Sequence, residues 1–336
     1  MIVRARAPLR VDLAGGWTDV AVYAGRHGGA VVNVALALYA HVLVRRGGQG
    51  VRLRALDLGA VVSAQRLEDL RADGELALVK ASARRYAPAG PLEIVTRSDA
   101  PPGSGLGGSG ALGVALVAAL GTMEGKRWMP AEIAGAAFET EVLDAGIVGG
   151  KQDQYAAALG GLQFIAFGDP EVAATRLDVP ADTLRELEQT LVLCYTGASR
   201  LSSDTHQRVW EAFGRGERAI VQALDGLRAC ALAMRGALQR GALGDVARIL
   251  DENWACQQAL ADGMRTPTME ALETVGRAAG ADGVKSCGAG AGGCLAFLAR
   301  PGREAEVAEA LRAAGGVILR AGFDMAGVAA WQAAER

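Results

Sequence analysis

Three oxygen-bearing side chains, Ser109, Glu141 and Asp153, have the chemistry that phosphoryl transfer needs. Ser109 ends a glycine-rich loop, Glu141 follows within a predicted helix, and Asp153 comes after a glycine pair. A hydroxyl and a carboxylate are hard oxygen ligands that suit Mg²⁺. A second carboxylate can accept the proton of an attacking hydroxyl group. Together the three side chains predict a site for metal-assisted phosphoryl transfer to an alcohol.

The loop that carries Ser109 has the composition of a polyphosphate site. Pro101–Ala111 holds five glycines and two serines directly before an apolar run of helical length, Ala111–Leu120. Glycine lets several backbone N–H groups point into one concavity, and the helix start adds partial positive charge. A plain surface turn would not need so many glycines, and the loop matches neither a Walker motif nor a dinucleotide fingerprint. The predicted ATP contacts are Pro102, Gly103, Ser104, Gly105, Leu106, Gly107, Gly108 and Ser109.

Glu141 falls on the apolar face of a helix predicted over Ala131–Ala145. At roughly 100° per residue, the apolar side chains from Ile133 onward span an arc of about 180°, and Glu141 lies near its middle. An unpaired carboxylate buried there would be costly, so a partner is expected. Mg²⁺ is one such partner. A salt bridge to an inward-pointing arginine is the alternative.

Asp153 opens a helix predicted over Gln152–Leu159, just after a glycine turn. In the functional interpretation, its carboxylate orients a sugar hydroxyl and takes the proton. In the structural interpretation, it is an ordinary acid of the first helical turn, favoured by the helix dipole. Lys151, nearby, either meets a phosphate group or is a solvated lysine.

The N-terminal segment Pro8–Asp19 runs from a strand into a glycine turn. Strand alternation places Arg10 and Asp12 on the same face. Asp19, beyond the glycine pair, is either a ligand for sugar hydroxyls or a turn aspartate. A second glycine loop, Lys285–Gly293, is predicted between a helix and a strand, where its glycines either approach a ligand or allow close packing at a tight turn.

Positioning these side chains takes a mixture of strands and helices. Strands are predicted at Val3–Leu13, Ala30–Val34, Ala40–Arg45, Leu92–Thr96, Gly161–Phe167, Thr190–Tyr195, Cys294–Ala299 and Val317–Arg320. Further helices are predicted across 204–239, 246–260, 269–279 and 303–314. Because strands and helices do not alternate regularly, we expect an α+β fold. The polar stretch Pro170–Glu188 is predicted to be irregular, and a boundary near residue 185 gives domains 1–185 and 186–336.

Composition narrows the classes of function. The 336 residues carry a net charge of -2 and are 51% apolar, so we expect a sizeable core and neither nucleic acid nor a membrane surface as a partner. Five cysteines without a CxxC pair, and only three histidines, disfavour a zinc site and favour reduced thiols. The N-terminus lacks a signal-peptide layout, and no apolar run reaches about 18 residues. A cytoplasmic protein is expected.

Taken in order, the motifs resemble those of the GHMP kinases over nearly the whole chain. The first family motif is matched by Ala7–Asp19, the second by Pro102–Ser109, and the third by Lys285–Gly293. The resemblance implies an N-terminal domain similar to ribosomal protein S5 and a ferredoxin-like C-terminal domain. It also implies that ATP and a small-molecule substrate bind in the cleft between them.

The resemblance implies a role for each matched residue. Ser109 and Glu141 match the family's Mg²⁺ ligands, and Asp153 matches its catalytic aspartate. Arg10 matches the basic residue beside that aspartate, and Asp19 matches a sugar-binding aspartate. In the third motif, the implied ATP contacts are Gly288 and Gly290.

The turn near Asp19 and the residue at 151 point to a substrate group within the family. The turn lacks the Glu-His pair of galactokinases and is similar to L-fucokinase domains and to heptose 7-phosphate kinases. Lysine at position 151 is typical of the heptose group, and a cation suits a substrate that already carries a phosphate. Predicted substrate contacts are Gly16, Trp17, Thr18, Asp19, Lys151 and Arg200. The implied reaction phosphorylates the anomeric hydroxyl of D-glycero-D-manno-heptose 7-phosphate. The protein is expected to be a monomer or a homodimer.

Two alternatives stay open. One is a kinase of the same family that acts on L-fucose or another sugar. The other is a nucleotide-binding regulator without turnover. The intact set of Ser109, Glu141 and Asp153 disfavours the regulator, because a pure sensor has no need of a base.

Overall fold

Alternating apolar residues at the N-terminus build an inner strand of the larger sheet. The computed structural model describes residues 1–168, 171–199 and 203–333, and in it every second residue of β1 from Val3 to Leu13 is almost fully buried. The sheet has eight strands in the order β12-β1-β2-β5-β3-β4, with β6 beside β2 and β7 beside β6. They are β1 (Ile2–Ala14), β2 (Gly29–Arg46), β3 (Val51–Ala55), β4 (Ala60–Ala64), β5 (Leu92–Ser98), β6 (Leu162–Phe167), β7 (Val172–Arg176) and β12 (Ala329–Ala333).

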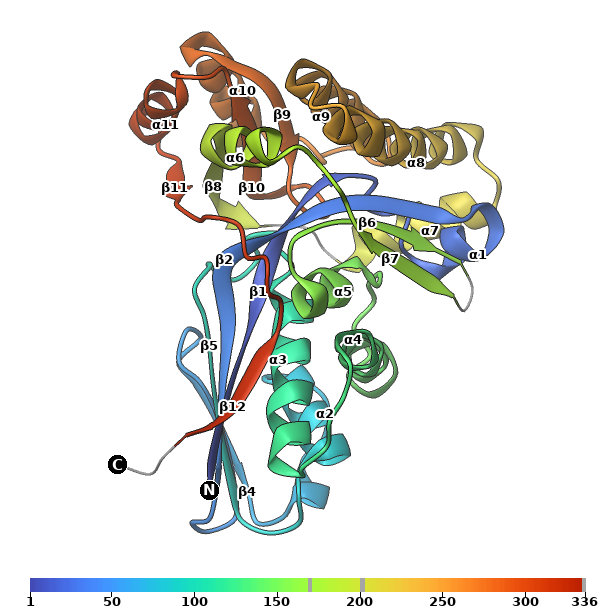
Figure 1. The fold of residues 1–336 in the computed structure, drawn as a ribbon. Coiled ribbons are helices and arrows are strands. Elements are labelled where there is room, and N and C mark those ends of the chain that lie inside the picture. The colour runs from blue at the N-terminus through green and yellow to red at the C-terminus, as the bar shows by residue number, and fades with distance from the viewer. Residues whose placement is uncertain (169–170, 200–202, 334–336) are drawn as a thin grey trace.

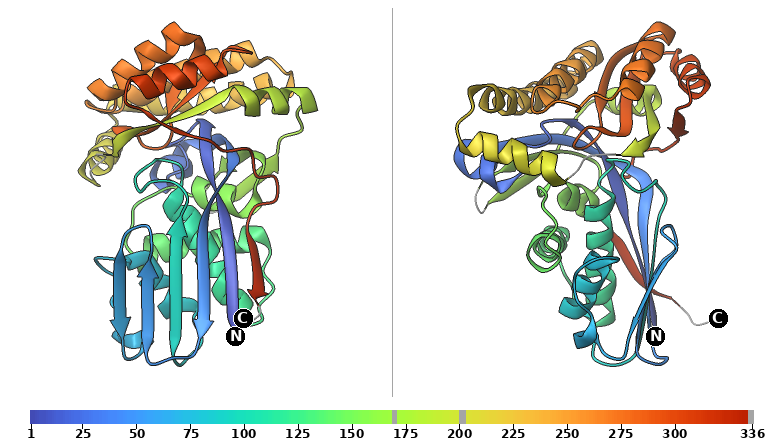
Figure 2. Two further views of the ribbon diagram at one scale, coloured as in Figure 1. Left: turned by 90° about the vertical axis from the view of Figure 1, so that its left-hand side faces the viewer. Right: turned by 180° about the vertical axis from the view of Figure 1, so that it is seen from behind.

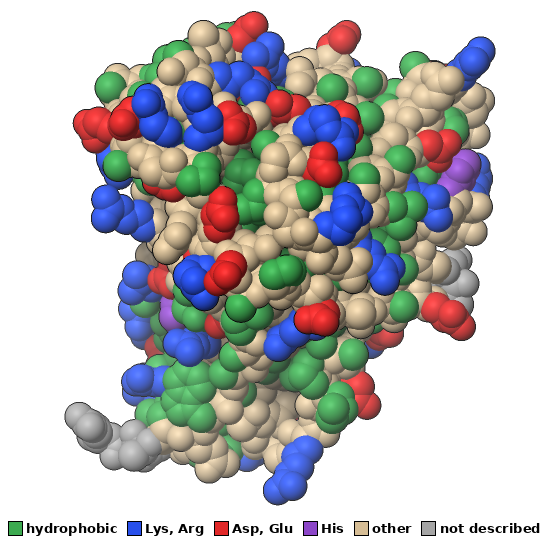
Figure 3. Space-filling view, turned by 45° about the horizontal axis from the view of Figure 1, so that its top comes forward, with side chains coloured by type: hydrophobic (Ala, Val, Ile, Leu, Met, Phe, Trp, Pro, Cys, Tyr) green, Lys and Arg blue, Asp and Glu red, His purple; other side chains and the backbone are tan. Residues whose placement is uncertain are grey.

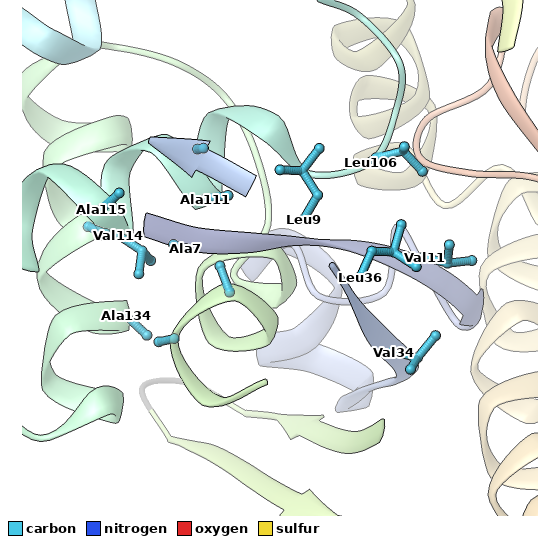
Figure 4. Packing of buried hydrophobic residues seen from close by; sticks show 14 of the residues in the cluster. Ala7, Leu9, Val11, Val34, Leu36, Leu106, Ala111, Val114, Ala115 and Ala134 are labelled. Carbon is cyan, nitrogen blue, oxygen red and sulfur yellow. The ribbon is translucent and has the colours of Figure 1, made fainter. Parts of the chain in front are cut away.

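Helices α2 to α5 cover one face of this sheet (Figures 1 and 2). The central helix α3 is apolar on nearly every side because it packs between the sheet and the other helices. Figure 4 shows Leu9 of β1, Leu36 of β2 and Val114 of α3 in this apolar layer. The helical elements here are α1 (Ala21–His27), the 3₁₀ turn η1 (Leu67–Asp69), α2 (Ala77–Tyr86), α3 (Gly108–Met123), α4 (Pro130–Glu139), the π-helical turn η2 (Thr140–Asp144) and α5 (Gln152–Leu159).

A smaller antiparallel sheet of four strands, in the order β11-β8-β10-β9, forms the other unit. The hairpin of β9 and β10 lies between helical segments, as in the β-α-β-β-α-β arrangement of a ferredoxin-like domain. The predicted α+β fold class is confirmed. The elements are α6 (Ala181–Thr190), β8 (Leu191–Ser199), α7 (Ser203–Gly214), α8 (Arg218–Gln239), α9 (Leu243–Gln258), α10 (Pro267–Ala279), β9 (Ala281–Ser286), β10 (Gly292–Ala299), α11 (Glu304–Ala313) and β11 (Val317–Leu319).

The last strand returns to the larger sheet. After β11 the chain passes Leu36, which bridges to Phe323, and β12 then pairs antiparallel with the first residues of β1. Figure 1 shows this descent from the smaller unit along the larger sheet. Strands from both ends of the chain therefore lie side by side, and the division into domains 1–185 and 186–336 stays a prediction.

Four local predictions differ from the structure. The strands predicted separately at Ala30–Val34 and Ala40–Arg45 form one continuous strand, β2. The described part of Pro170–Glu188 is not irregular, because it contains β7 and most of α6, whose Leu187 is fully buried beneath a polar outer face. The second glycine loop follows strand β9 rather than a helix. The helix that starts at residue 130 is α-helical only to Glu139. It continues as the π-helical turn η2, in which Ala145 N donates to Thr140 O at 3.0 Å.

The surface carries charges of both signs. Figure 3 shows Lys and Arg side chains interspersed with Asp and Glu over the face that it presents. The five cysteines are free thiols. Within the described ranges, no helix is both long enough and apolar enough to cross a membrane.

Candidate active site

The sequence motifs meet at a cavity of about 650 Å³. The cavity is lined by the first glycine loop, by the turn after β1, and by η2 and the start of α5, which contact that loop. The predicted site residues that line the cavity are Arg10, Gly16, Trp17, Asp19, Glu141, Asp153, Gly288 and the segments 102–105 and 107–109.

Two nitrogens of the Arg10 guanidinium contact the same carboxylate oxygen of Asp153. Arg10 Nε donates to Asp153 Oδ1 at 2.8 Å, and Arg10 Nη2 lies 2.6 Å from the same oxygen. Burial alone would lower the pKa of Arg10, but the charges of Asp153 and Asp12 outweigh it and raise that pKa. Arg10 is therefore a permanent cation. The contact leaves Asp153 Oδ2 available to a hydroxyl group in the cavity.

Arg10 also fixes the first glycine loop. Its Nη1 donates to the Gly105 carbonyl at 2.5 Å, and its backbone N donates to the Leu106 carbonyl at 2.9 Å. Gly107 has φ +75, and a Cβ there would lie 3.2 Å from both Arg10 Cγ and Asp153 Cγ. The glycine lets the loop approach the ion pair this closely.

Glu141 and Ser109 both line the cavity and are hydrogen-bonded to each other. Glu141 is only 6% exposed, which confirms its predicted burial, and the Ser109 hydroxyl donates to its Oε1. The π-helical turn that carries Glu141 is a feature often found at functional sites. Among the residues that the structure describes, no arginine pairs with Glu141, so the predicted alternative of a salt bridge is not observed.

Asp19 lies on the cavity wall beside the turn that precedes α5. Gln152 N donates to Asp19 Oδ2 at 3.0 Å. A Cβ on Gly150 would lie 1.9 Å from the same oxygen, so this position has to be glycine. Burial, opposed by the hydrogen bond from Gln152, raises the pKa of the Asp19 carboxyl to about 6.

This pKa gives a stability prediction for Asp19→Asn. A pKa raised from 3.8 to about 6 means that the folded protein favours the protonated carboxyl, so the ionised form destabilises the fold as pH rises through 6. At pH 8 we expect the free energy of unfolding of the variant to exceed that of the wild type by at most about 3 kcal/mol, so that the variant melts at a higher temperature, and we expect almost no gain at pH 4. Thermal unfolding at both pH values measures this. Asp182→Asn, whose side chain is 89% exposed, is the control, and an equal shift at both pH values for Asp19→Asn would contradict the prediction.

The two glycine loops touch each other through backbone atoms. Gly105 has φ +74, and a Cβ there would lie 1.9 Å from the Cys287 carbonyl oxygen. A Cβ on Gly288 would in turn lie 2.8 Å from the Gly105 carbonyl oxygen. Gly290 lies away from the cavity lining, where a Cβ would meet Met264 Sδ at 2.9 Å. Close packing thus explains these glycines, and Gly288 also faces the cavity.

Thr18 and Leu106 shape the site from behind, although both were predicted to contact ligands. Thr18 is fully buried, and its hydroxyl bonds the Gly15 carbonyl and both backbone groups of Ala30. Leu106 is fully buried in the main core. Their side chains hold the turn and the loop in place.

Lys151 and Arg200 are the two residues predicted to contact a phosphate of the substrate. Lys151 is half-buried, and its ammonium lies 5.4 Å from the centre of the Phe138 ring. Its neighbours Gly150 and Gln152 line the cavity, but Lys151 does not. Arg200 lies outside the described residues.

Two parts of the cavity wall come from segments without a recognisable motif. His206 of α7 stacks on Trp17 with ring centroids 4.4 Å apart, and it lines the cavity at that end. Burial lowers the pKa of His206, which favours a neutral ring. Another part of the wall is apolar and includes Leu58, Leu76 and Leu78. Tertiary packing alone brings these residues to the site.

A buried ion pair joins the first and third motifs. Lys285 Nζ lies 2.9 Å from Asp12 Oδ2 and donates to the Asp12 carbonyl at 2.6 Å. Neither side chain is more than 2% exposed. A Cβ on Gly16 would lie 2.2 Å from the same Asp12 oxygen, so Gly16 makes room for the pair.

The chain is similar to known proteins. Residues 76–161 match the GHMP kinases N terminal domain, and residues 234–317 match the GHMP kinases C terminal domain. The D-glycero-alpha-D-manno-heptose 7-phosphate kinase of Campylobacter jejuni is 32% identical over 98% of this chain and 99% of its own. The L-fucokinase/L-fucose-1-P guanylyltransferase of Bacteroides fragilis is 30% identical over 89% of this chain and 35% of its own.

A solved structure extends the likeness to the fold. A D-glycero-D-manno-heptose 1-phosphate kinase from Bacteroides thetaiotaomicron superposes with a TM-score of 0.82 at 29% identity, covering 99% of this chain and 100% of that one. Both family domains occur here in order, and the resemblance spans the full length. The chain belongs to the GHMP kinase family and has its two-domain fold.

Proposed function

We propose that this protein transfers the γ-phosphoryl group of ATP to the anomeric hydroxyl of D-glycero-D-manno-heptose 7-phosphate. The observation that carries the proposal is the Arg10–Asp153 pair beside the first glycine loop, in which Asp153 Oδ2 has no hydrogen-bond partner among the described residues. A base with a free oxygen beside a phosphate loop fits transfer to an alcohol. A nucleotide sensor would not need it.

In the proposed reaction, the sugar hydroxyl oxygen attacks the γ-phosphorus and the bond to the β–γ bridging oxygen breaks, which releases ADP. Asp153 Oδ2 orients the hydroxyl and accepts its proton. Arg10 holds the Asp153 carboxylate in place and offers positive charge beside the transferred group. Backbone N–H groups of the first loop and of the start of α3 bind the phosphates.

Ser109 and Glu141 are the residues that would hold Mg²⁺. Both present hard oxygen atoms, and Glu141 is a buried carboxylate whose described partners are the neutral Ser109 and Gln154. Two protein ligands suit Mg²⁺, which usually keeps waters and phosphate oxygens as its other ligands. When bound, the ion neutralises charge on the phosphates.

The cavity wall also suggests where each substrate lies. The apolar part that contains Leu58, Leu76 and Leu78 suits a nucleotide base. Asp19 and the Trp17–His206 stack suit a polyhydroxylated ring, which offers hydroxyls to the acid and an apolar face to the aromatics. We place the reaction in the cytoplasm, where ATP is available.

The substrate choice rests on the relatives and on Lys151. The Campylobacter relative is named for a heptose 7-phosphate, and Lys151 lies between two cavity-lining residues along the chain. L-Fucose is the second candidate, because the Bacteroides fragilis relative carries an L-fucokinase activity in its name.

A substrate panel tests the proposal. We expect ADP release with heptose 7-phosphate to exceed that with the unphosphorylated heptose, heptose 1-phosphate and L-fucose by at least about tenfold in kcat/KM, which corresponds to a difference of about 1.4 kcal/mol in transition-state binding. Coupled spectrophotometric assays at fixed MgATP measure this. A higher kcat/KM for L-fucose would replace the proposed substrate. ATP binding without turnover on any sugar would favour the regulator.

A further inference from the structure

Gln154 is a buried amide that touches the candidate metal ligand. It lies in the first turn of α5, is 2% exposed and lines the cavity next to Asp153. Its Nε2 donates to Glu141 Oε2 at 2.5 Å, while the Ser109 hydroxyl donates to Oε1. Each oxygen of the Glu141 carboxylate thus has one donor, and the two donors fix the plane of the carboxylate.

The two donors are not equivalent. Ser109 is a metal ligand in the proposed site, so its hydroxyl group would contact the cation as well as Glu141. Gln154 is the donor among the described contacts that can hold Glu141 without being a ligand itself. Its position is also secure, because Gly110 leaves room for Asp153 and the first turn of α5 against α3: a Cβ there would lie 2.5 Å from Asp153 Cβ and 3.1 Å from Gln154 N.

The polar side chain of Gln154 lowers the stability of the fold at this position. Its Oε1 is buried and has no hydrogen-bond partner among the described residues. A buried acceptor without a partner destabilises a fold, and a leucine of similar volume would avoid that cost. The contact of Nε2 with Glu141 is the described interaction that accounts for an amide here.

We propose that Gln154 is a positioning residue that orients Glu141 and thereby sets the affinity of the site for a nucleotide-bound divalent cation. Hydrogen-bond partners behind a metal ligand typically contribute about 10–100-fold to metal affinity, because they hold the ligand in the orientation that the ion requires. The inference rests on the proposed function, in which Glu141 is a metal ligand.

Gln154→Leu tests the inference, with Mn²⁺ as the probe. Electron paramagnetic resonance of free Mn²⁺ in the presence of ADP is expected to show an affinity about 10–100-fold weaker than in the wild type. The affinity for ADP without metal is expected to stay unchanged, and kcat is expected to recover as the Mn²⁺ concentration rises. A merely structural role would not produce this dependence on the metal.

Gln163→Leu is the matched control. Gln163 is also a buried glutamine, 3% exposed, whose Nε2 donates to the Gly160 carbonyl at 2.6 Å, and it does not line the cavity. This variant loses one buried hydrogen bond and is expected to keep the wild-type Mn²⁺ affinity. Gln154→Met, with a more adaptable side chain, serves the same test if the leucine variant does not fold.

The outcomes separate the inference from the function on which it rests. Wild-type Mn²⁺ affinity in the Gln154 variants, together with weakened affinity in Glu141→Gln, would overturn the inference alone. Wild-type affinity in Glu141→Gln would show that Glu141 is not a metal ligand and would remove the proposed metal site as well.

Discussion

Replacing Asp153 by asparagine is expected to lower kcat about 10²–10⁴-fold while MgATP still binds. Asparagine keeps an oxygen for the hydrogen bond from Arg10 but cannot take up the proton of the attacking hydroxyl. The loop that would bind the phosphates is left intact. Steady-state kinetics with the sugar phosphate and a calorimetric titration with MgATP measure the two effects separately.

The control for this variant is the same substitution at an exposed acid. Asp182 has a side chain that is 89% exposed and pairs with Arg185 on the surface of α6, so Asp182→Asn is expected to keep wild-type kcat. Turnover of Asp153→Asn within a few-fold of the wild type would exclude Asp153 as the base.

Replacing Lys285 by methionine is expected to lower the free energy of unfolding by about 3–5 kcal/mol. The ammonium is fully buried and pairs with Asp12, so its removal leaves the buried carboxylate without its directly bonded cation. The loss is large because the pair joins the first strand to the loop of the third motif. Urea denaturation followed by tryptophan fluorescence measures it.

A second substitution separates the charge effect from lost packing. Lys285→Met combined with Asp12→Asn is expected to recover much of the stability, because the second change removes the unpaired charge. Arg240→Met, which breaks an exposed pair with Asp245 at 3.5 Å, is expected to cost less than about 1 kcal/mol. A loss for Lys285→Met as small as that for Arg240→Met would contradict the account of the buried pair.

Local patterns could be predicted from the sequence because their causes are local. The predicted helix Gln152–Leu159 has the observed bounds, since a glycine turn precedes it and a glycine ends it. The burial of Glu141 followed from the spacing of apolar residues, although the π-helical turn that begins at Thr140 was not anticipated. The change from i→i−4 to i→i−5 hydrogen bonds in a π-helical turn does not clearly alter the spacing of apolar side chains in the sequence.

Contacts between distant segments could not be predicted from periodicity. The stacking of His206 on Trp17 depends on how α7 packs over the turn after β1, and no sequence motif near His206 predicts this contact. The neighbours of Thr18 in the sequence suggest a substrate contact, but its hydroxyl bonds the backbone of β2. A motif therefore locates a site, whereas packing decides which of its side chains face the ligand.

The helix α6 shows the limit of composition as a guide. Its segment is polar enough to suggest an irregular chain, yet Leu187 and Thr190 are buried and support an amphipathic helix that leads into β8. A few apolar residues at helical spacing were sufficient, because the smaller sheet supplies the surface on which they pack.

Phosphorus NMR of the reaction mixture tests the central claim most directly. With MgATP and heptose 7-phosphate, the account predicts a new anomeric phosphate signal that grows in step with ADP while the original 7-phosphate signal persists, so that the product carries two phosphates. The same mixture with the Asp153→Asn variant is expected to show almost no product. Persistence of ATP beside unchanged heptose 7-phosphate, or a new phosphate on a carbon other than C1, would contradict the claim.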